Sequence, residues 1–522
     1  MPLKRTRKNA EATSTPGARP EDERLPFWSQ LTFGLQHVLT MYGGIIAPPL
    51  VVGGAAGLSG AEIGLLITAC LFVGGLATIL QTVGIPFFGA QLPLVQGVSF
   101  SGVATMIAIV ETQGGGRAGI QAIFGAVIAA SVIGFLITPL FSKIIRFFPP
   151  VVTGTVITTI GLTLMPVAAG WVMGGDPAAS DFGSMANLGL AAATLATVLL
   201  LSKLGNEAVS RLSILLAMIV GTVIAVFTGQ ADFSAVGEGD IFALPTPFAF
   251  GPPIFDVAAI VSMLIVILVT LTETSADLIA VGEIVKTKVD AKRIGNGLRA
   301  DMISSAIAPV FNSFTQSAFA QNVGLVAITG VKSRFVVAAG GGILVLLGLL
   351  PVLGRVVAAV PPPVLGGAGI VLFGTVAASG IRTLASVDYR GNMNLVIVAT
   401  SLGFGMLPIV APAIYSDFPA WFVTIFHSGI SSAALMAILL NLLFNHLKLG
   451  NSTNPSVFAA GAEARTVTAE QFAALREGDV VREGALIDCD GNPITITGSI
   501  AAVEESPGSR GRSGPPHPTA GH

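Results

Sequence analysis

The chain has 522 residues, of which 52% are hydrophobic and 11% are charged, and its mean hydropathy is +0.80. Soluble domains carry roughly 25% charged residues, so this composition excludes a soluble globular protein and indicates a polytopic membrane protein in a lipid bilayer. The formal net charge of −2 gives no reason to expect nucleic acid as a partner, and two cysteines exclude a disulfide framework.

Residues 1–25 are polar and are predicted to be a disordered tail. Residues 26–448 form a series of apolar runs of about 20 residues, the length that a spanning helix needs, and predict an all-α polytopic membrane protein with fourteen spans. The spans are centred near residues 40, 72, 102, 129, 162, 195, 219, 266, 307, 325, 345, 373, 402 and 437. Residues 449–522 are mixed and charged, and are predicted to be a second, partly disordered tail.

Basic residues predict the orientation of these spans. With the N-terminus in the cytoplasm, the inward loops collect most of the lysines and arginines, whereas the outward loops hold only Arg117 and Arg355. Positive charge accumulates in cytoplasmic loops. Both termini are therefore expected in the cytoplasm, and the protein is expected in the cell (plasma or inner) membrane.

An internal repeat relates the two halves of the apolar region. The motif Pro-Pro-Val-Val-Thr-Gly at 149–154 returns as Pro-Pro-Val-Leu-Gly-Gly at 362–367. The first copy opens the fifth span on the inside and the second opens the twelfth on the outside, so two halves of seven spans are predicted to be inverted. The third and tenth spans, which are short and interrupted by glycine, occupy corresponding places. Such a pair is typical of the binding site of a transporter.

Polar residues gather in these two short spans. The third contains residues 96–102, and the tenth contains residues 321–330. Glycine and β-branched residues favour extended backbone over helix, and non-helical backbone at membrane depth must be buried in protein or line a cavity. We therefore expect residues 321–330 to be an extended segment that presents Gln321 to a polar ligand.

Charged side chains inside spans are costly and usually mark a functional site. Glu273 and Asp277 of the eighth span are four residues apart, which places them on one helix face about 6 Å apart. Asp301 opens the ninth span, and the pair Gln36-His37 lies in the first. Structural roles remain open for each: a neutral acid at Glu273, helix-packing hydrogen bonds at Asp277 and Asp301, and an interhelical donor at His37.

Together these residues predict a compact polar pocket near the middle of the membrane. An amide (Gln321), a carboxylate (Glu273), an aromatic ring (Phe100) and free backbone groups suit a small, flat heterocycle rich in hydrogen bonds. No cluster of basic residues accompanies them, which argues against a phosphorylated or strongly anionic substrate. No nucleotide-binding loop is present, and buried carboxylates can take up protons, so coupling to protons without a cofactor or metal is expected.

The chain resembles the nucleobase–ascorbate transporter family. The family signature Gln/Glu/Pro-Asn-x-Gly-x-x-x-x-Thr is matched by Gln321, Asn322, Gly324 and Thr329. Further matches are Gln36-His37, the pair Glu273 and Asp277, and Asp301 twenty residues before Gln321. The resemblance covers residues 26–448 and neither tail.

This resemblance implies a 7+7 inverted repeat in a homodimer. A core domain (spans 1–4 and 8–11) would carry substrate past a gate domain (spans 5–7 and 12–14) in an elevator-like manner, with short strands in spans 3 and 10. The implied substrate-binding residues are Ser99, Phe100, Glu273, Ala320, Gln321 and Asn322. The residues implied in proton coupling or pocket support are Gln36, His37, Asp277 and Asp301.

The resemblance also implies a substrate class. Gln at the first signature position occurs in xanthine and urate carriers, Glu in uracil carriers and Pro in ascorbate carriers, so Gln321 favours an oxidised purine. Ser99 stands where xanthine-restricted relatives tend to have Asn, and a small hydroxyl residue there goes with tolerance of urate. A uracil permease of the same family and an inorganic-anion transporter of the same fold are the alternatives, although Glu273 would repel an anion. No nucleophile–base pairing predicts an enzyme.

Overall fold

The structure, a computed structural model, describes residues 19–141, 147–237, 239–389, 393–447, 480–482 and 485–487. The chain divides into two units, Met1–Pro455 and Ser456–His522. The second unit contains a hairpin of two antiparallel strands, β3 (Val480–Arg482) and β4 (Ala485–Ile487). The other residues of the predicted C-terminal tail and residues 1–18 lie outside the described residues.

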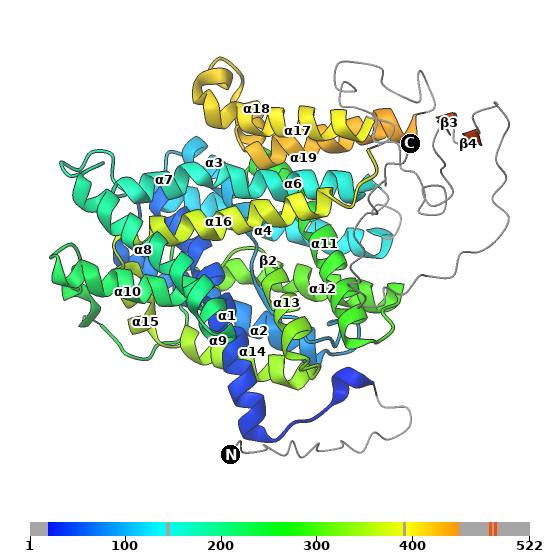
Figure 1. Cartoon of the computed structure of the whole chain (residues 1–522). Coiled ribbons are helices and arrows are strands. Elements are labelled where there is room, and N and C mark those ends of the chain that lie inside the picture. Colours follow the sequence, from blue (N-terminus) through cyan, green and yellow to red (C-terminus); the bar gives the residue numbers. More distant parts are fainter. Residues whose placement is uncertain are drawn as a thin grey trace, which may run out of the picture. The chain divides into compact units, whose positions relative to one another are not determined.

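The first unit is built from helices (Figure 1). In chain order they are α1 (Phe27–Ala55), α2 (Gly60–Val83), α3 (Val103–Thr112), α4 (Gly116–Ile137), α6 (Pro150–Thr163), α7 (Met165–Met173), α8 (Met185–Leu204), α9 (Glu207–Arg211), α10 (Ser213–Phe227), α11 (Val257–Val285), α12 (Ala291–Ile307), α13 (Ala320–Thr329), α14 (Arg334–Gly348), α15 (Pro351–Ala358), α16 (Pro362–Leu384), α17 (Met393–Val410), α18 (Ala420–Phe426) and α19 (Gly429–Asn441). Two short strands, β1 (Gln96–Val98) and β2 (Gln316–Ala318), lie among them.

Many of these helices can cross a membrane. Among the described residues, nine helices are long and apolar enough, and a tenth crossing follows if α14 and α15, which meet at a bend of 79°, count as one. The helices Phe100–Thr112, Ser213–Phe227 and Ala320–Thr329 are apolar but shorter. The chain is therefore a mostly helical multi-pass membrane protein, and the count of fourteen spans stays a prediction.

Several of the described helices begin or end where short polar residues or glycine satisfy the terminal backbone groups. Ser59 and Glu62 form a capping box at the start of α2. The side chains of Asp256 and Asp290 accept backbone N–H groups in the first turns of α11 and α12. Gly330, with φ of 67°, ends α13 in the left-handed conformation that glycine adopts without strain.

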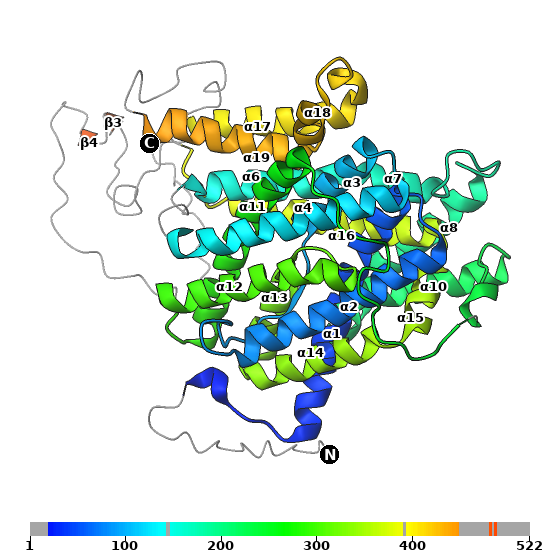
Figure 2. The same ribbon diagram turned by 180° about the vertical axis from the view of Figure 1, so that it is seen from behind.

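The helices of the first unit form two groups, defined by which helices pack on one another. In the first group, α14 packs on α1 and α2, and α4 packs on α3, α11 and α12. In the second group, α16 packs on α6, α7 and α8, α19 packs on α6 and α17, and α10 packs on α8 and α9. Figure 1 shows α16, α6 and α17 running side by side, and Figure 2 shows α12, α2 and α14 from behind.

Glycine allows close packing within each group. A Cβ atom on Gly75 of α2 would lie 2.6 Å from the carbonyl oxygen of Gly341 in α14. A Cβ atom on Gly161 of α6 would lie 2.3 Å from the backbone nitrogen of Ala377 in α16. Helices in a bilayer associate largely through such small-residue contacts, so a side chain at either glycine would separate its helix pair.

The two copies of the repeated motif open helices that pack on each other. α6 begins at Pro150 and α16 at Pro362. The helices run in opposite directions, since Gly154 near the start of α6 lies against Leu384 at the end of α16, and Gly161 lies further along against Ala377. This antiparallel contact is the arrangement expected of two halves with inverted orientation.

Residues 19–25 have an ordered structure, which corrects the prediction of a disordered tail over residues 1–25. Glu21 is fully buried and forms an ion pair with Arg293 at the start of α12. Asp22 accepts a hydrogen bond of 2.7 Å from Nε of Arg334 at the start of α14. The composition of the tail does not reveal this order, because the arginines that hold it follow 272 and 312 residues later.

Candidate functional site

The centre of the first group is a ribbon of two strands. β1 and β2 pair antiparallel in a register that places Gln96 opposite Ala318. Hydroxyl groups of neighbouring helices accept the N–H groups at the ribbon's edges: Thr78 of α2 accepts from Gln96 at 2.9 Å, and Ser305 of α12 accepts from Gln316 at 2.8 Å. This extended backbone is therefore bonded within the protein, as a hydrocarbon environment requires.

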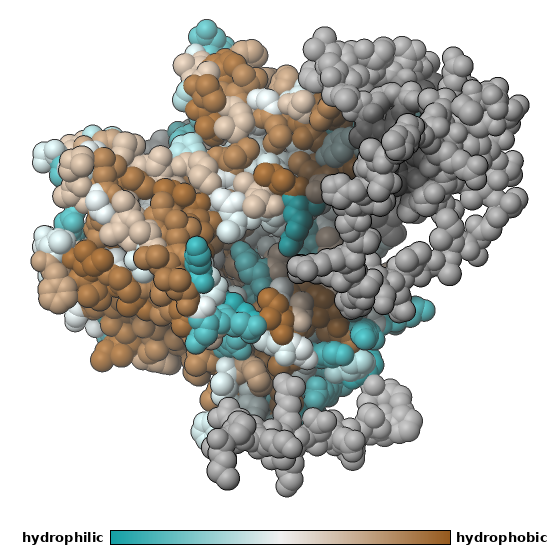
Figure 3. Space-filling view, in the orientation of Figure 1, coloured by the Kyte–Doolittle hydropathy of each residue, from teal (hydrophilic) through white to brown (hydrophobic). Residues whose placement is uncertain are grey.

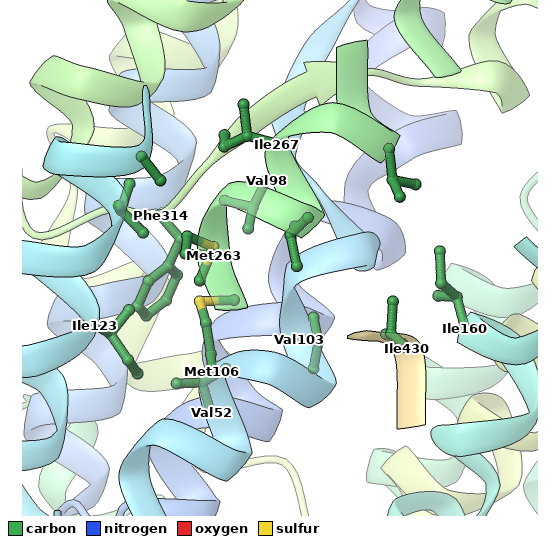
Figure 4. Close-up of a cluster of buried hydrophobic side chains, with 14 of the residues drawn as sticks. Val52, Val98, Val103, Met106, Ile123, Ile160, Met263, Ile267, Phe314 and Ile430 are labelled. Carbon is green, nitrogen blue, oxygen red and sulfur yellow. The ribbon is translucent and has the colours of Figure 1, made fainter. Parts of the chain in front are cut away.

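A short helix follows each strand. β1 leads through a 3-10 turn (Phe100–Gly102) into α3, and β2 leads directly into α13. Both helices thus begin beside the ribbon, where their free N–H groups and the positive ends of their dipoles lie. Beneath the ribbon, Val98 and Phe314 pack with Met106 and Met263 in a fully buried apolar cluster, which gives the site a rigid base (Figure 4).

The segment that was expected to be extended is helical, which corrects the prediction for residues 321–330. α13 covers Ala320–Thr329, and the extended residues come directly before it. Gly324 does not break this helix: a Cβ atom there would meet nothing within 4 Å, so the glycine leaves open space beside α13. Gln321 and Ala320 are exposed at the start of the helix.

Gln321 lines a cavity of about 360 Å³ between the two helix groups. The first group contributes α1 and α13 to its walls, and the second contributes α8, α9, α10 and α16. Figure 3 shows brown surfaces over α8, α10 and α17, and teal residues gathered across the hollowed middle of this face. Glu273, Asp277, Ser99, Phe100 and Ala320 are not among the residues that line this cavity.

Asn322 fastens α13 to α1. It is fully buried, and its Nδ2 lies 3.0 Å from Nδ1 and 3.1 Å from the carbonyl oxygen of His37. Because an amide nitrogen only donates, Nδ1 of His37 acts as the acceptor and its ring proton belongs on Nε2. These contacts place Asn322 and His37 as a brace between two walls of the cavity. Gln36 is half-buried, and its side chain has no hydrogen-bond partner among the described residues.

Asp301 is buried and bonded at both carboxylate oxygens. Oγ1 of Thr274 donates to Oδ2 at 2.6 Å, and Nε2 of Gln81 donates to Oδ1 at 3.2 Å. Thr274 also accepts the N–H group of Ala318 at 3.3 Å, which links Asp301 to β2. Sequence reasoning missed Gln81 and Thr274, because single polar residues in apolar helices give no sign of a partner 220 or 27 residues away.

Gln81→Leu is expected to lower the free energy of unfolding, because it leaves Oδ1 of Asp301 and the N–H group of Ala90 without their buried partners. Each loss costs about 1–3 kcal/mol. Thermal unfolding of the purified protein measures the loss of stability. Gln91→Leu, which changes a glutamine that bonds with Arg19 at the protein surface, is the control, and an effect of equal size there would contradict the role of Gln81.

Glu273 and Asp277 are half-buried carboxyl groups on α11, which packs on α13. Neither has a hydrogen-bond or ion-pair partner within the part of the chain that the structure describes. Carboxyl groups inside spanning helices normally find partners, so two without one indicate a place for a ligand or a proton.

Phe100 and Ser99 face different surroundings. The Phe100 ring packs edge-on against the ring of Phe373 in α16, with the two ring centroids 6.4 Å apart. This contact joins the two helix groups. Ser99 is buried, and its hydroxyl lies 2.6 Å from that of Ser101, which lies 2.9 Å from that of Thr270 in α11. The Ser99 hydroxyl is therefore linked to α11 through Ser101.

Sequence reasoning also missed Phe319, the residue between β2 and α13. Its ring is buried in space left by two glycines: a Cβ atom would lie 2.7 Å from the ring at Gly44 and 2.6 Å from it at Gly97. Phe319 thus packs β1, β2 and α1 together. Nothing in the sequence distinguishes this phenylalanine from the many other apolar residues of the chain, although the two glycines that make room for its ring can be seen there.

Solved structures with the same fold are known. The transmembrane domain of a cyanobacterium bicarbonate transporter, BicA, superposes with a TM-score of 0.51 at 15% identity and covers 80% of this chain and 98% of its own. SLC26A9 superposes with a TM-score of 0.56 at 13% identity over 80% of this chain and 66% of its own. At these identities the likeness concerns the fold.

A multi-pass bundle with two short paired strands at the centre of one helix group, and a cavity between that group and the other, has the architecture of a membrane transporter. The model of a permease family matches residues 28–414. The chain belongs to this family, the nucleobase–ascorbate transporters.

Curated relatives match most of the chain. The uric acid transporter UacT of Escherichia coli (strain K12) is 41% identical over 417 residues, which are 80% of this chain and 86% of the relative. The xanthine permease of Bacillus subtilis (strain 168) is 38% identical over 419 residues, 80% and 94% of the two chains. The uric acid permease PucJ of the same organism is 40% identical over 418 residues, 79% and 92%.

Proposed function

We propose that the protein is a proton-coupled symporter of an oxidised purine, urate or xanthine. The observation that carries the proposal is the position of Gln321: the first residue of the family signature lines the cavity between the two helix groups. A side-chain amide offers one donor and one acceptor side by side, which match a neighbouring carbonyl and N–H group on a purine edge. The relatives named for uric acid and xanthine support the same substrate class.

In this proposal the pocket residues divide into two sets. Glu273 accepts a hydrogen bond from a ring N–H group, Gln321 selects the purine, and Phe100 supplies an aromatic face. Backbone groups near Ala320 add hydrogen bonds to the substrate, and Ser99 limits its size. Asn322 acts through its brace to His37. Asp277, Asp301, His37 and Gln36 support the pocket and the movement of the proton, and no cofactor or metal takes part.

The two helix groups provide the moving parts of the proposed mechanism. The first group, which holds the ribbon and Gln321, is the core domain, and the second group is the gate domain. The groups meet through the rings of Phe100 and Phe373 and through the hydroxyls of Thr105 and Ser428, 2.9 Å apart. Contacts of this kind can break and re-form as the core slides past the gate. We place the protein in the cell membrane as a homodimer with both termini in the cytoplasm.

The test is uptake of radiolabelled urate, xanthine and uracil by cells that express the protein, with and without a protonophore. We expect uptake of urate or xanthine that the protonophore abolishes. Uptake of uracil alone would contradict the assignment of Gln321, and purine uptake that ignores the protonophore would contradict proton coupling.

Gln321→Glu is expected to weaken purine uptake by about tenfold or more at unchanged membrane levels. Glutamate has no amide donor, so a purine carbonyl that accepted from Gln321 loses its partner at a cost of about 1.5 kcal/mol. Competition by unlabelled purines against labelled substrate measures the change. Gln113→Glu, the same chemical change at the end of α3 and outside the cavity, is the control. Normal purine uptake by Gln321→Glu would place the pocket elsewhere.

A further inference from the structure

Arg211 lines the same cavity as Gln321 but belongs to the other helix group. It is the last residue of α9, at the junction between α8 and α10, whereas Gln321 lies on α13. Among the described residues that line the cavity, Arg211 is the one with a charged side chain. The polar residues around the cavity are Thr40, Ser202, Ser210, Ser213, Gln321 and Thr375.

Most of the hydrogen-bonding capacity of Arg211 is unused. Its side chain is 18% exposed, and Nη2 lies 3.2 Å from Oε2 of Glu207, one helical turn earlier. That contact is the single hydrogen bond of the guanidinium group in the described part of the chain. A guanidinium group has five N–H donors in a flat fork, so four of them remain for a ligand or water.

The contact with Glu207 does not neutralise the site. The Glu207 side chain is 84% exposed, and an exposed pair at this helical spacing is weak and screened by salt. The positive charge of Arg211 therefore acts mainly on the cavity that its side chain lines. A flat ligand with negative charge and ring carbonyl oxygens complements this fork best.

Oxidised purines differ in charge, and a positively charged side chain such as Arg211 would distinguish them. Urate loses a proton in mildly acidic solution and is a monoanion at neutral pH, whereas xanthine is neutral in mildly acidic solution. A purine is smaller than the cavity of about 360 Å³, which leaves room for a position beside Arg211 as well as one beside Gln321.

We propose that Arg211 and the serines around it form a second subsite of the cavity, which binds the monoanion of an oxidised purine on its way to or from Gln321. The inference rests on the proposed function and adds a specificity element to it. Because Arg211 belongs to the second helix group, the subsite stays with the gate while Gln321 moves with the core. It therefore favours urate over neutral purines without changing the contacts that Gln321 makes.

The experiment is binding of radiolabelled urate and radiolabelled xanthine to the full-length protein in lipid nanodiscs, at mildly acidic pH. Arg211→Gln is expected to weaken urate binding by roughly three- to tenfold and to leave xanthine binding within about twofold. Arg211→Lys should restore most of the urate affinity. Added salt should weaken urate binding to the wild type and have little effect on Arg211→Gln.

Two variants serve as controls. Lys203→Gln also removes one positive charge, but from the exposed end of α8, outside the cavity lining. It is expected to change the binding of neither urate nor xanthine. Glu207→Gln removes the competing carboxylate and is expected to tighten urate binding.

Equal weakening of both ligands by Arg211→Gln, or no weakening of urate, would overturn the subsite while leaving the proposed function in place. The same holds if Lys203→Gln reproduces the effect. A wild-type protein that binds neither purine would overturn the proposed function, and the subsite with it.

Discussion

Glu273→Ala is expected to weaken purine uptake by roughly ten- to hundredfold while the protein still reaches the membrane. Glu273 is half-buried on α11 and has no partner among the described residues, so its carboxylate is free to accept from a ring N–H group. A hydrogen bond to a charged group contributes about 1.5–3 kcal/mol, which corresponds to roughly ten- to hundredfold weaker binding when it is lost. Binding of labelled urate to the purified protein and uptake by cells measure the loss.

The matched control is Glu283→Ala, the same chemical change on an exposed side chain near the end of the same helix. It is expected to transport like the wild type. Normal uptake by Glu273→Ala would remove Glu273 from the pocket. An equal loss in both variants would mean that any change of charge on α11 disturbs the protein.

Asp301→Asn is expected to separate binding from accumulation. The asparagine side chain would fill the same space but cannot take up a proton, and it offers one acceptor where Thr274 and Gln81 both donate. We expect substrate binding to fall by about tenfold or less, and uphill accumulation to disappear. A gradient of one pH unit is worth about 1.4 kcal/mol per proton, so a coupled wild type accumulates about tenfold for each proton.

Uptake into proteoliposomes with an imposed pH gradient measures accumulation. Exchange of labelled for unlabelled purine, without a pH gradient, measures binding and passage of the substrate across the membrane. Asp290→Asn, at the start of the same helix, is the control, because asparagine caps a helix as well as aspartate does. Accumulation by Asp301→Asn at the wild-type level would show that the coupling proton binds elsewhere.

The sequence predicts the helical membrane fold because hydropathy and span length are properties of single segments. It also singles out Gln321, Glu273 and Asp301 as candidate site residues, since a polar group inside an apolar run is conspicuous wherever its partner lies. For residues 321–330 the sequence predicts extended backbone, because a glycine such as Gly324 disfavours a helix. The structure shows a helix there. In the structure that glycine faces open space, and the helix simply lacks a side chain there.

The partners of these residues could not be predicted. Gln81, Thr274 and Phe319 meet the site through contacts between helices that are far apart in the chain, and periodicity within one helix does not encode them. The ordered segment around Glu21 was missed for the same reason. Arg211 has an ordinary place at a helix end in the sequence, and only the cavity distinguishes it.

The ribbon also has a consequence for how the protein is made. β1 emerges from the ribosome long before β2, since Gln96 and its partner Ala318 are separated by more than 200 residues, which take roughly 10–45 seconds to synthesise. During that interval the strand-pairing N–H and C=O groups of β1 lack their partner in a medium without water. Each unpaired group costs several kcal/mol in hydrocarbon. The growing chain must therefore shelter residues 96–98, against α2 or within the insertion machinery, until the second half of the ribbon arrives.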